Sequence, residues 1–268
     1  MVNKLKKIFE FIKNLILMYI DKGIAVKSAQ LSYYMLFTFF PILLFANSVF
    51  IRVIPANFDF RLSGIIPEPV IEFALSYLGE IENSHSITFM YTGAVLTFYS
   101  LSRYIRNYRL ALRDIYGKTR KIGFIRDWLF SFVLSIGLLL LFYLAIIVIF
   151  FADGLFDLSG LDNINEDTIV LLAFLVLAFY AYFVINLVQF LECGDRVKFI
   201  YFSKGVIIAV TVWIVISALF SYYAGEVTDY SVLYGSIGNV IMLLVWLNIT
   251  NTILLMSGVL NICLNKKP

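Results

Sequence analysis

The chain alternates between long apolar stretches and shorter segments that hold most of its charged residues. An apolar stretch of about 18 or more residues is long enough to cross a bilayer as a helix. The pattern predicts six crossings, of which the second is the shortest. The predicted spans are Ser28–Val53, Ile87–Leu101 with an extension as far as Ile105, Trp128–Phe151, Thr168–Leu191, Ser203–Ala224 and Ser236–Leu264.

A segment before the first span has the pattern of an amphipathic helix rather than of a crossing. Within residues 1–27, apolar residues recur at helical spacing and lysines lie opposite them. This pattern predicts a helix that lies on the membrane surface. Its apolar positions are Leu5, Ile8, Phe9, Ile12, Leu15, Ile16 and Tyr19.

A second amphipathic segment, residues 102–121, follows the second span. Its arginines share one face, and tyrosines and aliphatic residues share another. One interpretation is a helix that binds lipid headgroups. The other is an ordinary basic anchor whose apolar face packs on the remaining helices. Arginine and tyrosine also bind nucleic acids, but a position next to the membrane makes lipid phosphate the nearer anion. The candidate headgroup ligands are Arg103, Arg106, Arg109 and Arg113.

Composition and charge placement extend this pattern to a topology. The chain is 61% hydrophobic and 15% charged, whereas a soluble domain has about 25% charged residues. Lys and Arg gather on the cytoplasmic side of membrane spans, and here 19 of the 21 lie in the terminal segments and in the second and fourth loops. We therefore predict an all-α integral membrane protein with six spans and both termini in the cytoplasm. Its parts are the N-terminal helix (1–27), the spanning domain (28–264) and a short tail (265–268).

The polar residues inside the predicted spans are uncharged. Proton-coupled or ion-coupled transport usually leaves an ionisable residue at membrane depth, and none lies deep in these spans. Asn248, Asn251 and Thr252 share a helix face, so they either join helices or line a cavity with the first and second spans. The candidate path or cavity residues are Tyr34, Thr38, Pro41, Thr92, Thr97, Asn239, Asn248, Asn251 and Thr252.

Pro41 lies inside the first predicted span, where it removes a backbone donor. The carbonyl of Phe37 is then left for neighbouring groups to satisfy, and the Thr38 hydroxyl is one candidate. We interpret Pro41 as a hinge or cavity-lining position, with Tyr34 on the same face.

Two segments carry a resemblance to a known family. SAQLSYYMLFTFFPILLFANSV (28–49) and VLYGSIGNVIMLLVWLNITNTILLMSGVLN (232–261) resemble the signatures of the YihY/BrkB family. The span count, termini and length agree over nearly the whole chain. Family members often carry an acidic residue after the late glycine of the sixth span, where this chain has Val259 and Leu260. The resemblance implies a bacterial cytoplasmic (inner) membrane protein concerned with envelope lipids.

The same family was long labelled a tRNA-processing ribonuclease, and the residues argue against that activity here. A zinc nuclease needs several His and Asp ligands, and this chain has one histidine. We expect no enzyme activity, metal, cofactor or nucleic-acid partner. The leading hypothesis is a protein that handles or transports anionic lipids. The alternatives are a scaffold that recruits a protein partner and a small-molecule or ion transporter built from inverted halves; homo-oligomerisation is left open.

Overall fold

The computed structural model describes residues 2–53, 87–118, 123–158, 166–193, 203–226 and 236–265. Within these residues every regular element is a helix, which confirms the predicted all-α class. The helices are α1 (Val2–Asp21), α2 (Ile24–Val53), α4 (Ile87–Ile115), α5 (Phe124–Leu158), α6 (Glu166–Cys193), α7 (Lys204–Glu226) and α9 (Ser236–Asn265).

Each predicted span falls within one long helix, and four of these helices are long and apolar enough to cross a membrane. The four are α5, α6, α7 and α9, through windows that cover Ile125–Phe142, Leu175–Glu192, Lys204–Tyr223 and Gly238–Leu264. Crossings by α2 and α4, and the cytoplasmic position of the termini, stay predictions.

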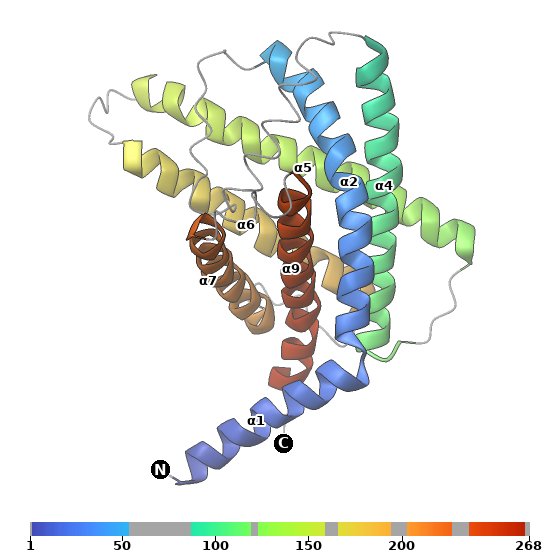
Figure 1. Ribbon diagram of the computed structural model, residues 1–268, viewed down its shortest axis with the longest axis vertical. Coiled ribbons are helices and arrows are strands. Elements are labelled where there is room, and N and C mark those ends of the chain that lie inside the picture. Colours follow the sequence, from blue (N-terminus) through green and yellow to red (C-terminus); the bar gives the residue numbers. More distant parts are fainter. Residues whose placement is uncertain are drawn as a thin grey trace.

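The helices form two sets with different directions (Figure 1). α2 and α4 run side by side, α9 packs against α2, and α7 packs against α9. α5 and α6 cross behind this set at a steep angle, and both contact α4. α1 lies below the set and contacts α2 and α9. The face of α4 that points inward is therefore enclosed by α2, α5, α6 and α9.

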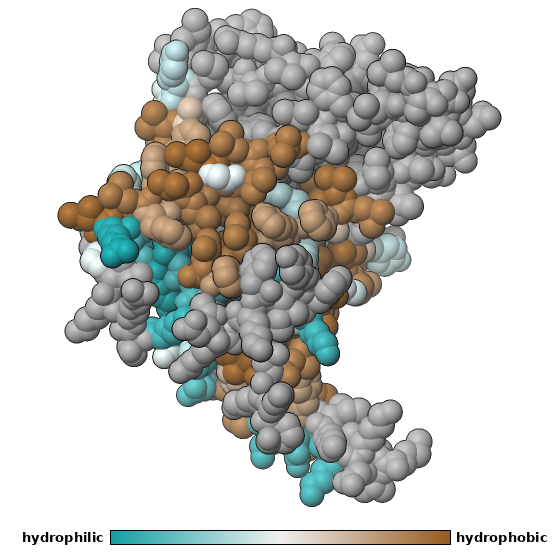
Figure 2. All heavy atoms as spheres, turned by 180° about the vertical axis from the view of Figure 1, so that it is seen from behind, coloured by the Kyte–Doolittle hydropathy of each residue, from teal (hydrophilic) through white to brown (hydrophobic). Residues whose placement is uncertain are grey.

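Apolar packing around α4 and α9 forms the core. Buried residues of α4, among them Ile105, Leu112 and Ile115, cluster with Leu255 and Val259 of α9. Many large apolar side chains on α5, α6 and α7 are instead exposed, as expected for surfaces that face lipid. Figure 2 shows them as a broad apolar band across the back of the molecule, with hydrophilic residues gathered below it and at one edge.

A glycine turn separates α1 from α2. Gly23 has a φ of 56°, a left-handed conformation that favours glycine and ends helices. The backbone N–H of Gly23 donates to the carbonyl of Ile20, which closes the last turn of α1. α2 then begins at Ile24, ahead of the predicted boundary at residue 28.

The second predicted span and the basic segment are one continuous helix. α4 runs from Ile87 to Ile115 without interruption and ends at Gly117, whose φ is 66°. No glycine or proline lies between residues 94 and 116 to break it. The arginines are thus fixed rigidly to a helix whose other end is a predicted span.

Candidate functional site

The four candidate arginines on α4 lie in two different environments. Arg109 and Arg113 are 2% and 8% exposed, whereas Arg103 is exposed and Arg106 is intermediate. Arg103 faces α2. The other three arginines face the start of α5 or the end of α6. The arginine face predicted from spacing alone is therefore divided between two neighbours of the same helix.

A buried ion cluster joins Arg109 and Arg113 to Asp127 of α5 and Glu192 of α6. The Nε atoms of Arg109 and Arg113 donate to the two oxygens of the Glu192 carboxylate. Arg113 Nη2 also donates to Asp127 Oδ1 at 2.7 Å. Asp127 and Glu192 are 3% and 7% exposed. Each carboxylate thus binds both guanidinium groups, and α4, α5 and α6 are held together at one end.

Two further contacts complete the ion cluster. Arg109 Nη1 donates to Ser131 Oγ at 2.6 Å, and Arg106 Nε donates to Asp127 Oδ2 at 3.3 Å. Asp127 lies in the first turn of α5, where the helix dipole favours an anion. Burial disfavours the cation of Arg113, but the hydrogen bonds and charges of Glu192 and Asp127 outweigh burial and raise the pKa of Arg113. The cluster is therefore a network of charge-assisted hydrogen bonds between three helices.

Arg103 has a different set of neighbours, which we call the arginine site and define as Arg103, Tyr99 and Tyr34. Arg103 Nη1 donates to the hydroxyl of Tyr99 at 2.8 Å. Its guanidinium carbon lies 5.7 Å from the centre of the Tyr99 ring and 5.9 Å from that of Tyr34 on α2. Among the described residues no carboxylate pairs with Arg103. The site presents one cation and two aromatic rings at the surface between α2 and α4.

A set of buried amides joins the remaining helices. Asn251 of α9 accepts from the Tyr104 hydroxyl of α4 at 2.9 Å and donates to Ser32 Oγ of α2 at 3.3 Å. Gln189 of α6 donates to Ser257 Oγ at 2.6 Å and accepts from Asn261 at 2.7 Å. These contacts tie α9 to three neighbouring helices.

Asn261 also holds the start of α7. Its Oδ1 accepts from the Ser203 hydroxyl and from the backbone N–H of Gly205, each at 2.9 Å. A Cβ atom on Gly205 would lie 2.7 Å from the backbone nitrogen of Asn261. Glycine at this position therefore permits the close approach of α7 and α9.

Residues 16–268 match the model of the family described as "Virulence factor BrkB". The chain belongs to the virulence factor BrkB family. Among curated proteins, this BrkB-family chain is 24% identical over 250 residues to "Putative ribonuclease-like protein YfkH" of Bacillus subtilis (strain 168), with 90% of each chain covered. No solved structure matches it.

The candidate path residues of this BrkB-family chain differ in their burial and in their contacts. Asn251 is fully buried in contacts between helices. Asn248 is half-buried, and its carbonyl accepts from Thr252 of the same helix at 2.8 Å. Asn239 and Thr252 are half-buried, Thr92 is exposed, and Thr97 is buried with no hydroxyl partner among the described residues.

The surroundings of Pro41 differ from the sequence-based expectation. α2 continues through Pro41 to Val53. The Thr38 hydroxyl donates to the carbonyl of Tyr34 at 2.8 Å, so its single hydrogen does not serve Phe37, and that candidate was wrong. Between α2 and α9 the interface is filled: Met35, Leu36 and Phe39 pack against a buried cluster of α9. That cluster consists of Leu243, Trp246 and Leu247.

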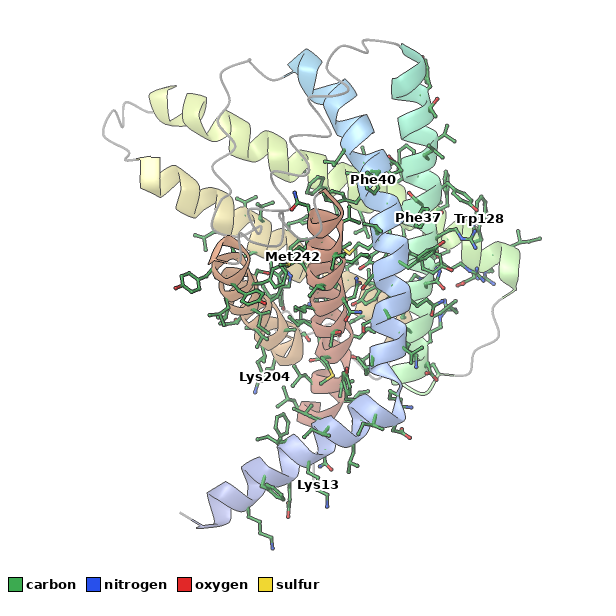
Figure 3. The ribbon with its side chains drawn as sticks, in the orientation of Figure 1. Lys13, Phe37, Phe40, Trp128, Lys204 and Met242 are labelled. Carbon is green, nitrogen blue, oxygen red and sulfur yellow. The ribbon has the colours of Figure 1, made fainter. Side chains whose placement is uncertain are left out.

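Two members of the ion cluster were missed by sequence reasoning. Asp127 and Glu192 each lie one residue outside a predicted span. The signal that could have found them is a lone acid at the end of an apolar helix, on the side of the membrane predicted to be basic. Such an acid needs a basic partner. Figure 3 shows the neighbouring Trp128 at the start of α5, beside α4, where this part of α5 meets the arginine helix. Headgroup binding by Arg109 and Arg113 stays a prediction, which would require the two carboxylates to give way.

Proposed function

We propose that this chain handles anionic phospholipids of the cytoplasmic membrane, without enzyme activity, and that the arginine site contacts their phosphate. The observation that carries the proposal is the exposed guanidinium of Arg103, held by Tyr99 and facing Tyr34. A planar guanidinium matches phosphate geometry, and tyrosine is favoured where membrane and water meet.

The position of the arginine site along α4 supports this proposal. Arg103 follows the second predicted span directly, on the side predicted to be cytoplasmic. On one side of it the surface is aromatic: the Tyr33 ring lies 5.6 Å from that of Tyr34 and 4.7 Å from that of Phe37, and Tyr33 and Phe37 are 56% and 54% exposed. On the other side Gln30 of α2 donates to Asn107 of α4 at 3.4 Å. A long arginine side chain at this depth can reach the headgroup layer while its stem stays in contact with apolar groups. A lipid with its chains along α2 and α4 would bring its phosphate to Arg103.

The packing between α2 and α9 bears on where a lipid would contact the protein. In this structure the first and sixth predicted spans are joined by packed side chains and by Asn251. We therefore place the proposed lipid contact on the outer face of α2 and α4 and not between α2 and α9. Transport across the bilayer is the finer hypothesis, which the experiment below separates from binding.

The ribonuclease wording in the name of the relative does not carry over to our proposal. The chain has one histidine. Among the described residues no three His, Cys, Asp or Glu side chains come together as metal ligands do. The contacts that we describe are those of a binding surface and of helix packing.

The test uses the full chain in liposomes of phosphatidylcholine with fluorescent phosphatidylglycerol. Binding of phosphatidylglycerol to the purified protein is measured by native mass spectrometry, and movement between leaflets by dithionite quenching. Because a charge-assisted hydrogen bond contributes about 1.5–3 kcal/mol, we expect Arg103→Gln to weaken phosphatidylglycerol binding by about 10-fold or more. Arg103→Lys, which keeps the charge, should retain part of it.

Arg126→Gln is the matched control, since Arg126 is also exposed and lies near the same end of the helices. An equal loss of phosphatidylglycerol binding in the two glutamine variants would indicate a general charge effect. It would overturn the assignment of the arginine site as the phosphate contact. Binding without leaflet movement would leave a lipid-binding protein that does not transport. No preference for phosphatidylglycerol over phosphatidylcholine in the unaltered protein would overturn the proposed function itself.

A further inference from the structure

α1 presents three different faces to its surroundings. One face, which includes Leu15, Met18 and Tyr19, packs on the core around α4 and α9. Met18 Sδ lies 3.5 Å from Cys263 Sγ of α9. Because residues three and four apart share a helix face, this face runs along the second half of α1. The contact with the bundle fixes which sides of α1 remain open.

A second face of α1 is apolar but has no protein neighbour among the described residues. Phe9, Ile12, Ile16 and Ile20 follow one another at spacings of three and four residues. Their exposed fractions are 70%, 49%, 54% and 68%. The sequence predicted one continuous apolar stripe, whereas the structure divides that stripe between the bundle and the outside. Four large apolar side chains in one exposed row need a partner.

The third face of α1 is mainly polar, although Leu17, which is 52% exposed, also lies on it. Lys6, Glu10, Lys13 and Asn14 are all exposed, and Figure 3 shows Lys13 on the side of α1 that points away from the other helices. Four lysines and two acids in twenty residues prevent α1 from crossing a bilayer as a helix. One face of α1 contacts the other helices, the next is apolar and exposed, and the third is mainly charged. This arrangement fits a position where protein, membrane and water meet.

The attachment of α1 to α2 keeps this face near the membrane. Only Lys22 and Gly23 separate the two helices, and α2 contains the first predicted span. Lys22 Nζ donates to the carbonyl of Asp114 at 3.3 Å, and Lys27 Nζ lies 2.6 Å from Asp114 Oδ2. These two contacts, which we call the clamp at Asp114, hold the turn at the end of α4. The C-terminal end of α1 therefore lies where α2 begins.

We propose that the row Phe9, Ile12, Ile16 and Ile20 inserts into the headgroup boundary of an anionic membrane surface, with Lys6 and Lys13 on its phosphates. Amphipathic helices of this kind bury their apolar face about 5–10 Å into the boundary and respond to anionic lipid. Through the clamp at Asp114, the same contact would fix the end of the helix that bears Arg103. This proposal is independent of lipid handling at the arginine site.

The test places a spin label at one position at a time on the full chain in nanodiscs, in a background of Cys193→Ser and Cys263→Ser. Ile16→Cys and Ile12→Cys report on the exposed apolar row, and Lys13→Cys is the matched control one residue away. Collision with oxygen, which enters lipid, is compared with collision with a water-soluble nickel chelate. The nanodiscs contain phosphatidylcholine alone or phosphatidylcholine with phosphatidylglycerol.

We expect labels at 12 and 16 to meet oxygen in preference to nickel, more strongly with phosphatidylglycerol, while the label at 13 meets nickel. Equal nickel access at 13 and 16 in both lipids would overturn the proposal. Protection of position 16 from both reagents in both lipids would also overturn it, since a protein partner or second copy would then cover the row. Adding Arg103→Gln should leave the contrast unchanged, so this proposal and the proposed function fail separately.

Discussion

Arg109 and Arg103 lie six residues apart on one helix but have opposite surroundings. Arg109 is buried, and its guanidinium binds Glu192, Asp127 and Ser131. Arg103 is exposed, and its neighbours are the rings and hydroxyl of Tyr99 and Tyr34. The difference follows from what α4 packs against at each turn. α5 and α6 bring carboxylates to Arg109, and α5 also places the Phe130 ring 4.4 Å from its guanidinium carbon. At Arg103, α2 brings the Tyr34 ring beside the Tyr99 ring of α4 itself and brings no carboxylate among the described residues.

The comparison distinguishes a buried charge that joins helices from an exposed charge that we propose binds a ligand. A buried arginine that binds carboxylates from two other helices holds those helices in place. An exposed arginine with aromatic neighbours contributes little to packing, and our proposal assigns Arg103 a lipid phosphate as its ligand. Arg106, which is half-buried and contacts Asp127 at 3.3 Å, lies at the boundary between the two environments.

The largest effect should come from removing one charge of the buried ion cluster. Glu192→Gln leaves the guanidinium groups of Arg109 and Arg113 without one of their two carboxylates. Breaking a buried ion pair on one side costs about 3–5 kcal/mol of unfolding free energy. Thermal unfolding in detergent should therefore show a large fall in Tm. Asp114→Asn is the control, because that carboxyl group is 61% exposed in its pair with Lys27, and exposed pairs contribute about 0–1 kcal/mol. Similar Tm losses in the two variants would contradict the assignment of the cluster as structural.

Much of the fold follows from the sequence because a membrane leaves few alternatives. Uninterrupted apolar stretches must form helices there to satisfy their backbone groups, and each predicted span does lie in a helix. The positive φ of Gly23 and Gly117 marks the ends of α1 and α4, and glycine at a helix end is readable in sequence. What periodicity does not reveal is the steep crossing of α5 and α6 behind the other helices, which depends on side-chain packing.

The candidate site was less predictable for a related reason. Spacing on a helix shows that Arg103, Arg106, Arg109 and Arg113 lie on one side of α4, but not which helix each one meets. Asp127 and Glu192 lie 65 residues apart in sequence, and only the meeting of α5 and α6 at α4 brings them together. Asn251, by contrast, was expected either to join helices or to line a cavity, and its contacts with Ser32 and Tyr104 correspond to the first interpretation.

An intermediate effect is expected from the buried amide of Asn251. Asn251→Ala removes the partner of the Tyr104 hydroxyl and of Ser32 inside the bundle. The expected loss of unfolding free energy lies between about 0.6 kcal/mol, the average for hydrogen bonds between membrane helices, and about 3 kcal/mol for a buried polar group left unpaired. Chemical unfolding in mixed micelles measures this loss. Asn248→Ala, one turn away and half-buried, should cost less; a greater cost there would show that Asn248 carries the helix contact.

Raising the salt concentration should weaken the contacts of exposed Arg103 more than those of buried Arg109, without any substitution. The Debye length falls from about 10 Å at 0.1 M to about 3 Å at 1 M ionic strength, and buried pairs are screened much less than exposed ones. We expect phosphatidylglycerol binding to weaken several-fold over this range, while the Tm of the protein in neutral detergent changes little. A Tm that falls together with lipid binding would mean that the ion cluster is open to solvent, and the contrast between Arg109 and Arg103 would then be lost.

The smallest effect on stability should come from Arg103 itself. Arg103→Gln removes a charge that has no carboxylate partner among the described residues, and substitutions at exposed positions usually change the free energy of unfolding by less than about 0.5 kcal/mol. The Tm in detergent without added lipid should therefore match that of the unaltered protein. When phosphatidylglycerol is added, the unaltered protein should gain stability, because a ligand that binds only the folded state raises its Tm, and Arg103→Gln should gain less. A fall in Tm without lipid would instead show that Arg103 acts as Arg109 does, by holding α2 against α4 through Tyr34.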